Sequence, residues 1–139
     1  MIVLDTNVLS EIIRPAPDKL VLTWLAQQPR SAMFTTTITR AELLYGVHLL
    51  PEGQRKATLM TVVRNIFESD MAGQVLRFDN DAADAYAEIA ASRKLAGKPI
   101  SQFDAMIAAI ANSRGASLAT RNVKDFMDCG ITVINPWKA

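Results

Sequence analysis

Residues 2–7 of the sequence are Ile-Val-Leu-Asp-Thr-Asn, in which a short apolar run, Ile2 to Leu4, is followed by the carboxylate of Asp5. Its branched apolar side chains suit a strand that is covered on both faces of a sheet. The apolar residues that follow have helical spacing, and Thr6 or Asn7 is expected to cap that helix. In an open parallel sheet, ligands bind outside the carboxyl ends of the strands. We therefore expect Asp5 to lie at a binding site.

The order of strand followed by helix recurs along the chain. Apolar or β-branched runs predict further strands at residues 32–37, 75–78, 118–119 and 131–134. Helical spacing of apolar residues predicts helices that include residues 39–50, 57–67 and 103–113. This alternation predicts a single α/β domain over residues 1–139, with a parallel sheet of four to five strands and helices on both faces.

The composition limits the classes of function. The 139 residues carry a formal charge of +1, which excludes general electrostatic attraction to nucleic acid. A bound polyanion must then be held by a local basic patch or through bound cations. The single Cys129 excludes an internal disulfide and a cysteine-rich zinc site, and His48 alone gives little support to a histidine metal site or a Ser-His-Asp triad.

Targeting segments are not apparent in the sequence. It contains no run of about 20 apolar residues, so we expect no membrane association. Because we expect a strand to start at residue 2, we also expect no presequence. We expect a soluble, cytoplasmic protein.

Glu42 and Asp104 are two further acids near predicted helix starts. Each fits a capping box, because Thr39 precedes Glu42 by three residues and Ser101 precedes Asp104 by three. Asp104 also shares a helix face with apolar residues three, four and seven positions later, Ile107, Ala108 and Ala111. An isolated acid on a face that packs against the sheet is costly, and small alanines let the helix approach the strand ends. The alternative is that Asp5, Glu42 and Asp104 converge.

Such convergence requires a compensating charge. Two carboxylates about 5 Å apart repel by roughly 3 kcal/mol at an effective dielectric constant of 20. Mg²⁺, or Mn²⁺ as a substitute, accepts carboxylate and water oxygens and can also bind a phosphate oxygen. A metal-activated water held by Asp5, Glu42 and Asp104 suits phosphodiester hydrolysis.

Four ordered motifs and the chain ending resemble those of the PIN-domain family, in particular VapC-type toxins of the FitB-like branch. They are Ile2-Val3-Leu4-Asp5-Thr6-Asn7, Thr39-x-x-Glu42-x-x-x-Gly46, Ser101-x-x-Asp104-x-x-Ile107-Ala108, Ala119-Thr120-Arg121-Asn122 and Asn135-Pro136-Trp137. The resemblance covers essentially the whole chain. It implies a magnesium-dependent endoribonuclease, the homodimeric toxin of a type II toxin–antitoxin pair. It also implies an RNA substrate and a cognate antitoxin protein, through which operator DNA is bound only indirectly.

The sequence departs from the family at one position. A fourth acid commonly follows Thr-Arg, and here that residue is Asn122, which offers a carbonyl oxygen without charge. Asp125, about one helical turn later, either substitutes for it through water or is a solvated residue. The number of metal ions therefore stays open.

Several polar residues beside the acidic motifs have two interpretations. Thr6, Asn7 and Thr120 could support the metal ligands, or act only in turns and caps. Arg40 and Arg121 could hold phosphates, although solvated arginines are commoner.

Two other functions remain open at this stage. Asp5 could be the covalent nucleophile of a phosphotransferase, although residues 5–7 contain no second acid. The protein could instead be a catalytically weak binding module that acts mainly within an antitoxin–DNA repressor complex, which the uncharged Asn122 would suit.

Overall fold

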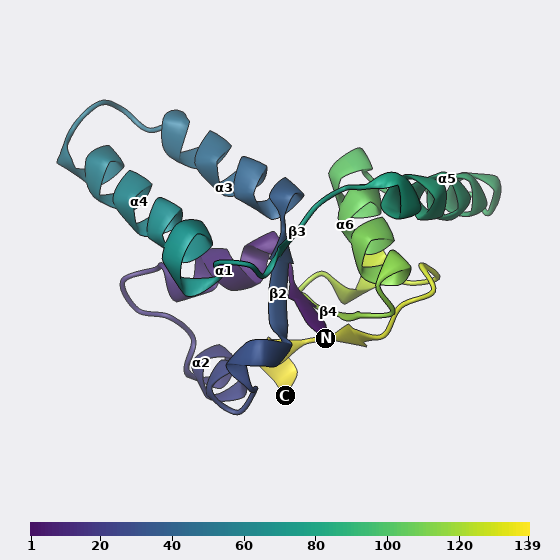
Figure 1. The fold of residues 1–139 in the computed structure, drawn as a ribbon, viewed down its shortest axis with the longest axis horizontal. Helices are drawn as coiled ribbons and strands as arrows, with labels where there is room; N and C mark the ends of the chain where they lie inside the picture. The colour runs from purple at the N-terminus through teal and green to yellow at the C-terminus, as the bar shows by residue number, and fades with distance from the viewer.

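The computed structural model describes residues 1–139 and contains a five-stranded parallel sheet in the order β3-β2-β1-β4-β5 (Figure 1). The strands are β1 (Ile2–Leu4), β2 (Met33–Thr36), β3 (Val75–Leu76), β4 (Ser117–Ala119) and β5 (Val133–Ile134). The predicted α/β fold with a parallel sheet is confirmed. The opening strand occupies the centre of the sheet, so the residue that follows it has neighbours on both sides.

Helices connect the strands and cover both faces of the sheet (Figure 1). The first four are α1 (Thr6–Ile12), α2 (Lys19–Ala26), α3 (Thr37–His48) and α4 (Gln54–Asn65). The last two are α5 (Asn80–Leu95) and α6 (Gln102–Ser113). A π-helical turn covers Ile66–Asp70, and 3₁₀ turns cover Arg30–Ala32, Val123–Phe126 and Pro136–Lys138.

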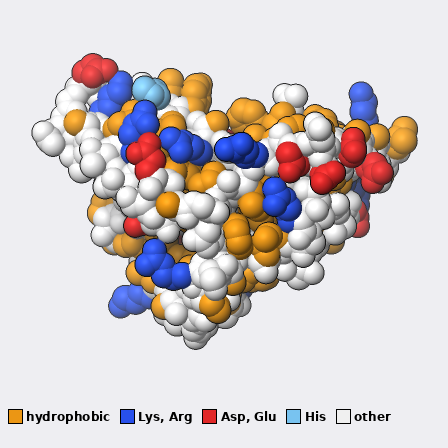
Figure 2. All heavy atoms as spheres, viewed as in Figure 1, with side chains coloured by type: hydrophobic (Ala, Val, Ile, Leu, Met, Phe, Trp, Pro, Cys, Tyr) orange, Lys and Arg blue, Asp and Glu red, His pale blue; other side chains and the backbone are white.

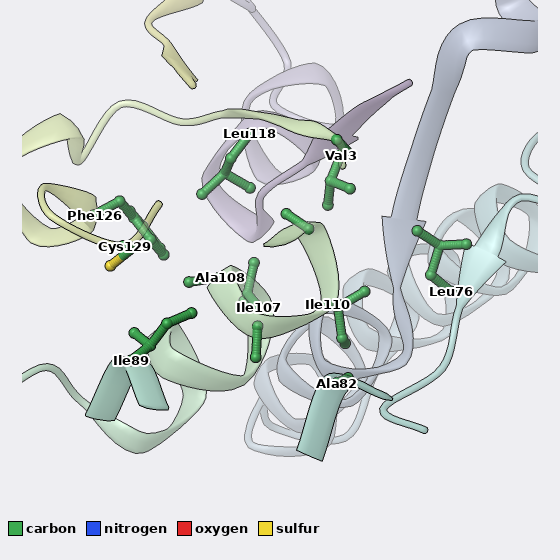
Figure 3. Packing of buried hydrophobic residues seen from close by; sticks show 13 residues of the cluster. Val3, Leu76, Ala82, Ile89, Ile107, Ala108, Ile110, Leu118, Phe126 and Cys129 are labelled. Atoms are coloured by element: carbon green, nitrogen blue, oxygen red, sulfur yellow. The ribbon is translucent and has the colours of Figure 1, made fainter. Parts of the chain in front are cut away.

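Alternation along β1 divides the buried side chains into two clusters. Val3 belongs to a cluster with Leu118 and residues of α5 and α6, such as Ile107 (Figure 3). Leu4 belongs to the cluster formed with α1 to α4, which includes Leu43. Successive side chains of a strand point to opposite faces, so adjacent residues of β1 anchor the two helical layers.

Two predictions of helix caps are wrong. Asp5, and not Thr6 or Asn7, caps α1, because its side chain accepts the backbone N–H of Thr6 at 2.8 Å. Thr36 caps α3 by accepting the N–H of Thr39 at 3.1 Å. Thr39 therefore lies inside the helix, and the capping-box interpretation of Glu42 fails.

Other boundaries differ by a few residues. The helix predicted at residues 57–67 begins at Gln54 and continues into the π-helical turn. The strand predicted at residues 75–78 has only two residues, Val75–Leu76, which pair with the end of β2. Ser101 caps α6 as the sequence indicates, accepting the N–H of Asp104 at 3.3 Å.

Charged side chains are unevenly distributed over the surface. On the face shown in Figure 2, acidic side chains gather over α5, whose exposed residues include Asp81, Asp84 and Glu88. The formal net charge of +1 is therefore a sum over surface regions that differ in local charge. No helix has the length and apolar character needed to cross a membrane.

Candidate active site

The structure brings Asp5, Glu42 and Asp104 together around one pocket of about 370 Å³, called here the acidic pocket. Asp5 directly follows the central strand, Glu42 lies in α3 and Asp104 lies in the first turn of α6. The two helices come from opposite faces of the sheet. The acids meet because α3 starts where β2 ends, beside the carboxyl end of β1.

Asp5 is the most buried of these acids, with 3% of its surface exposed. Its Oδ2 accepts the Thr120 hydroxyl at 2.7 Å and the Asn7 amide at 3.4 Å. Burial raises the pKa of Asp5 to about 6. The hydrogen bonds from Thr120 and Thr6 oppose that rise, and the negative charges of Asp104 and Glu42 add to it.

Threonine hydroxyls hold the Glu42 carboxylate. The Thr6 hydroxyl lies 2.7 Å from Glu42 Oε1 and 3.0 Å from Thr39 Oγ1. A hydroxyl has a single proton, which favours the shorter contact with a charged acceptor. Thr6 therefore links the start of α1 to the Glu42 carboxylate.

Asp104 is half-buried at the start of α6. Burial raises the pKa of its carboxyl group, the hydrogen bond with Ser101 opposes the rise, and the negative charge of Asp125 adds to it. The pKa values of Asp5 and Asp104 are thus both raised, in each case first by burial and further by a neighbouring carboxylate.

The two candidates for the fourth position occupy different places. Asn122 lines the acidic pocket, and its backbone N–H donates to Thr120 Oγ1 at 3.1 Å. Asp125 lines an adjoining hollow instead. Asn122 is thus nearer to the three acids, while Asp125 acts on Asp104 through its charge.

The two arginines singled out in the sequence also lie in different places. Arg121 lines the acidic pocket, where its guanidinium lies 5.3 Å from the centre of the Trp137 ring. Arg40 does not line it. The Arg40 guanidinium instead lies 3.3 Å from Glu68 Oε1 and over the Phe67 ring. Of these two arginines, only Arg121 is placed to meet a ligand in the acidic pocket.

Four lining residues were not singled out from the sequence: Ser10, Glu11, Arg14 and Trp137. Glu11 is 5% exposed and accepts from Arg14 Nη1 at 3.3 Å and from the backbone N–H of Asp18 at 2.9 Å. Its position four residues after Asn7, on the same helix face, was an available signal. No sequence pattern indicated that Trp137 lines the pocket, because this residue lies far along the chain from the lining residues of α1.

The donor set suits a hard divalent cation. The pocket carries carboxylate oxygens together with the carbonyl oxygens of asparagine side chains, the ligand type that Mg²⁺ and Mn²⁺ prefer. No three acidic, histidine or cysteine side chains are arranged to hold one ion among them. Mg²⁺ is commonly held by only one or two carboxylates and retains several waters, so the residues present fit it in that manner.

Comparison with known proteins finds similar sequences over almost the whole chain. Residues 2–127 match the family model of the PIN domain. The chain is 41% identical to VapC ribonuclease Y4jK of Sinorhizobium fredii, with 99% of each chain covered. It is 39% identical to toxin FitB of Neisseria gonorrhoeae, again with 99% of each chain covered.

A solved structure shares the architecture. The structure of FitAB bound to an IR36 DNA fragment matches with a TM-score of 0.92 and 38% identity, over 99% of this chain and 96% of that chain. The match in sequence and in fold thus extends over almost all of this chain. The chain therefore belongs to the PIN-domain family.

Proposed function

We propose that this protein is a Mg²⁺-dependent endoribonuclease and the toxin of a type II toxin–antitoxin pair. The observation that carries the proposal is the placement of Asp5, Glu42 and Asp104 around one pocket. The proposal is supported by relatives named as a ribonuclease and a toxin that align with the whole chain. A cellular RNA substrate would place this activity in the cytoplasm.

One or two of the three acids would bind Mg²⁺ directly, with Mn²⁺ as a possible substitute, and the remaining carboxylate would act through waters that the ion retains. When bound, the ion would lower the pKa of a water and stabilise charge on the phosphoryl and leaving oxygens. Thr120 and Thr6 keep the Asp5 and Glu42 carboxylates in fixed orientations through hydrogen bonds of 2.7 Å each. No covalent protein nucleophile is required.

The positive side chains of the acidic pocket have a separate role. Arg121 and Arg14 lie at the same pocket as the acids and can neutralise RNA phosphates. Arg14 also faces Glu11, which fixes its Nη1 at 3.3 Å from Glu11 Oε1. The phosphates of the proposed substrate would therefore contact both the arginine side chains and the metal ion.

The same comparison motivates a proposal about partner proteins. Two similar solved structures are described as FitAB bound to DNA and as FitAcB from N. gonorrhoeae. By analogy, we propose that a cognate antitoxin binds this protein, that two copies of the chain form a homodimer, and that operator DNA is reached only through the antitoxin.

An RNA cleavage assay tests the proposal. The purified protein, separated from any antitoxin, is incubated with single-stranded RNAs and folded tRNAs in Mg²⁺, in Mn²⁺ or in EDTA. Loss of supporting groups around a bound metal costs about 10- to 100-fold, so Asp104→Asn should lower the rate by more than about 100-fold. Glu88→Gln on the exposed surface of α5 makes the same change of charge and should cut at the parent rate.

Two outcomes would oppose the nuclease. Metal-independent cleavage, or equal rates for the parent and Asp104→Asn, would remove the role assigned to the acids. Absence of cleavage across all RNAs would favour the binding module, for which the uncharged Asn122 in the acidic pocket is the motivating observation.

A further inference from the structure

We infer that a second, basic hollow beside the acidic pocket holds the phosphate backbone of the RNA strand that enters that pocket. The basic hollow has a volume of about 610 Å³, and its basic side chains are Arg121, Lys124 and Lys138. This inference rests on the proposed function for the identity of the strand. It adds a substrate-binding surface outside the three acids.

The two hollows adjoin each other. Arg121 and Asn122 line both of them, so a ligand that leaves the acidic pocket past these residues enters the basic hollow. The hollow is formed by two chain segments that lie side by side at the ends of β4 and β5. Lys124 comes from the turn after β4, and Lys138 comes from the turn after β5.

The sign of the charge changes between the hollows. The acidic pocket contains Asp5, Glu11, Glu42 and Asp104 against two arginines. The basic hollow contains three cations against Asp125 alone. Neither Lys124 nor Lys138 takes part in an ion pair, and both are exposed, so their charges are available to a ligand.

Arg121 is held at the boundary by its aromatic neighbour. Its guanidinium lies 5.3 Å from the centre of the Trp137 ring, an arrangement in which the ring face attracts the cation. The Trp137 backbone N–H donates to Asn135 Oδ1 at 3.0 Å, which fixes the turn that carries the ring. Arg121 is thus directed to the place where a strand would pass from one hollow to the other.

The chemistry of the basic hollow favours a nucleic-acid backbone over a protein segment. Val123 is its one apolar lining residue. Protein partners usually bind through buried aromatic or apolar anchors, whereas this lining carries three cationic side chains and two asparagines. Lysine ammonium groups and asparagine amides are instead common donors to phosphate oxygens. A positively charged groove that tracks the backbone is also typical of sites for single strands.

Binding in a chelator tests this inference separately from cleavage. A fluorescently labelled single-stranded RNA is titrated with the protein in EDTA over a series of KCl concentrations. Each neutralised phosphate of a single strand contributes about 0.7 to the slope of log K against log salt. Lys124→Gln with Lys138→Gln should therefore weaken binding several-fold and reduce the slope by about 1.4.

Two control variants are matched to the double glutamine variant of Lys124 and Lys138. Lys94→Gln with Lys98→Gln makes the same charge change at exposed positions outside both hollows, and it should bind with the parent slope. Lys124→Arg with Lys138→Arg keeps the charges and should also restore the parent slope. In Mg²⁺, the glutamine variant should show a raised KM and an unchanged kcat if the proposed cleavage occurs.

The outcomes separate the two proposals. RNA binding that depends on Lys124 and Lys138, without any cleavage, supports the basic hollow and opposes the nuclease. Cleavage with equal RNA affinity and salt slope for the parent and the glutamine variant overturns the inference and leaves the nuclease intact. The inference is also overturned if the glutamine variant of Lys94 and Lys98 loses as much RNA affinity as that of Lys124 and Lys138. A loss of antitoxin affinity with unchanged RNA affinity overturns it as well.

Discussion

At the scale of single residues, Asp5 combines two roles that usually belong to different side chains. Its Oδ1 caps α1 through the N–H of Thr6, while Oδ2 is held by the Thr120 hydroxyl inside the acidic pocket. Both contacts stabilise the ionised form, yet burial prevails and raises the pKa to about 6. The same acid thus caps a helix and contributes a carboxyl group to the acidic pocket.

The stability of the metal-free protein should fall as the pH rises from 5 to 7. The raised pKa of Asp5 means that the folded state retains a proton that the unfolded chain has released. The stabilising contribution is fully present below the unfolded pKa of 3.8 and is lost as the pH rises through about 6. The shift implies a decrease of about 1 kcal/mol between pH 5 and pH 7.

Urea unfolding in EDTA at the two pH values measures this difference. Asp5→Asn should reduce the dependence on pH, because it removes the titrating group. Glu52 and Asp79 have lowered pKa values, so their contributions are lost only as the pH falls below this range. A parent protein whose stability rises from pH 5 to pH 7 would contradict the prediction.

At the scale of elements, the start of α3 connects helix capping to the acidic pocket. The Thr36 hydroxyl accepts the N–H of Thr39, whose own hydroxyl lies 3.0 Å from that of Thr6. Thr6 in turn contacts Glu42. Thr36 and Thr39 are fully buried, so these groups have no water to replace a lost partner.

Thr36→Val should lower the free energy of unfolding by about 1 to 2 kcal/mol. Valine keeps the volume of threonine but leaves the N–H of Thr39 without its acceptor. Thr36→Ser keeps the hydroxyl and loses one methyl group, a cost of about 0.8 kcal/mol. Chemical denaturation of both variants measures the difference, and a serine variant less stable than the valine variant would contradict the capping role.

At the scale of the whole molecule, Arg93 ties α5 to the segment that precedes β5. Arg93 is 8% exposed, and its guanidinium group forms no ion pair. It donates to the carbonyls of Lys98 at 2.7 Å and of Asp125 and Met127 at 2.9 Å each. Burial raises the pKa of Asp104 and the negative charge of Asp125 adds to the rise, so this contact also fixes part of the electrostatic surroundings of the acidic pocket.

Arg93→Met should lower the free energy of unfolding by about 3 kcal/mol. Methionine fills much of the space of the arginine stem but leaves the Lys98 and Asp125 carbonyls without a donor and the Met127 carbonyl with only the weak Cys129 thiol. Lys94→Met, at an exposed position on the same helix, should change stability by less than about 0.5 kcal/mol. Thermal unfolding compares the two variants, and similar melting temperatures would show that the Arg93 contacts contribute little.

The sequence by itself determined the features that depend on neighbouring residues. The apolar run ending at Asp5 predicted the strand and the acid at its carboxyl end, and Ser101 predicted the start of α6. The alternation of strands and helices predicted the parallel sheet, and the ordered motifs indicated the family. These signals are local, because caps and periodic patterns act within one or two turns of the chain.

Only the tertiary structure decided which of several equivalent groups is used. Thr36 and Thr39 are both chemically able to cap α3, and the end of β2 selects Thr36. Arg40 and Arg121 both flank acidic motifs, but only Arg121 reaches the acidic pocket. Trp137 joins that pocket from the far end of the chain. The strand order sets these contacts between distant segments, and no local pattern of residues encodes them.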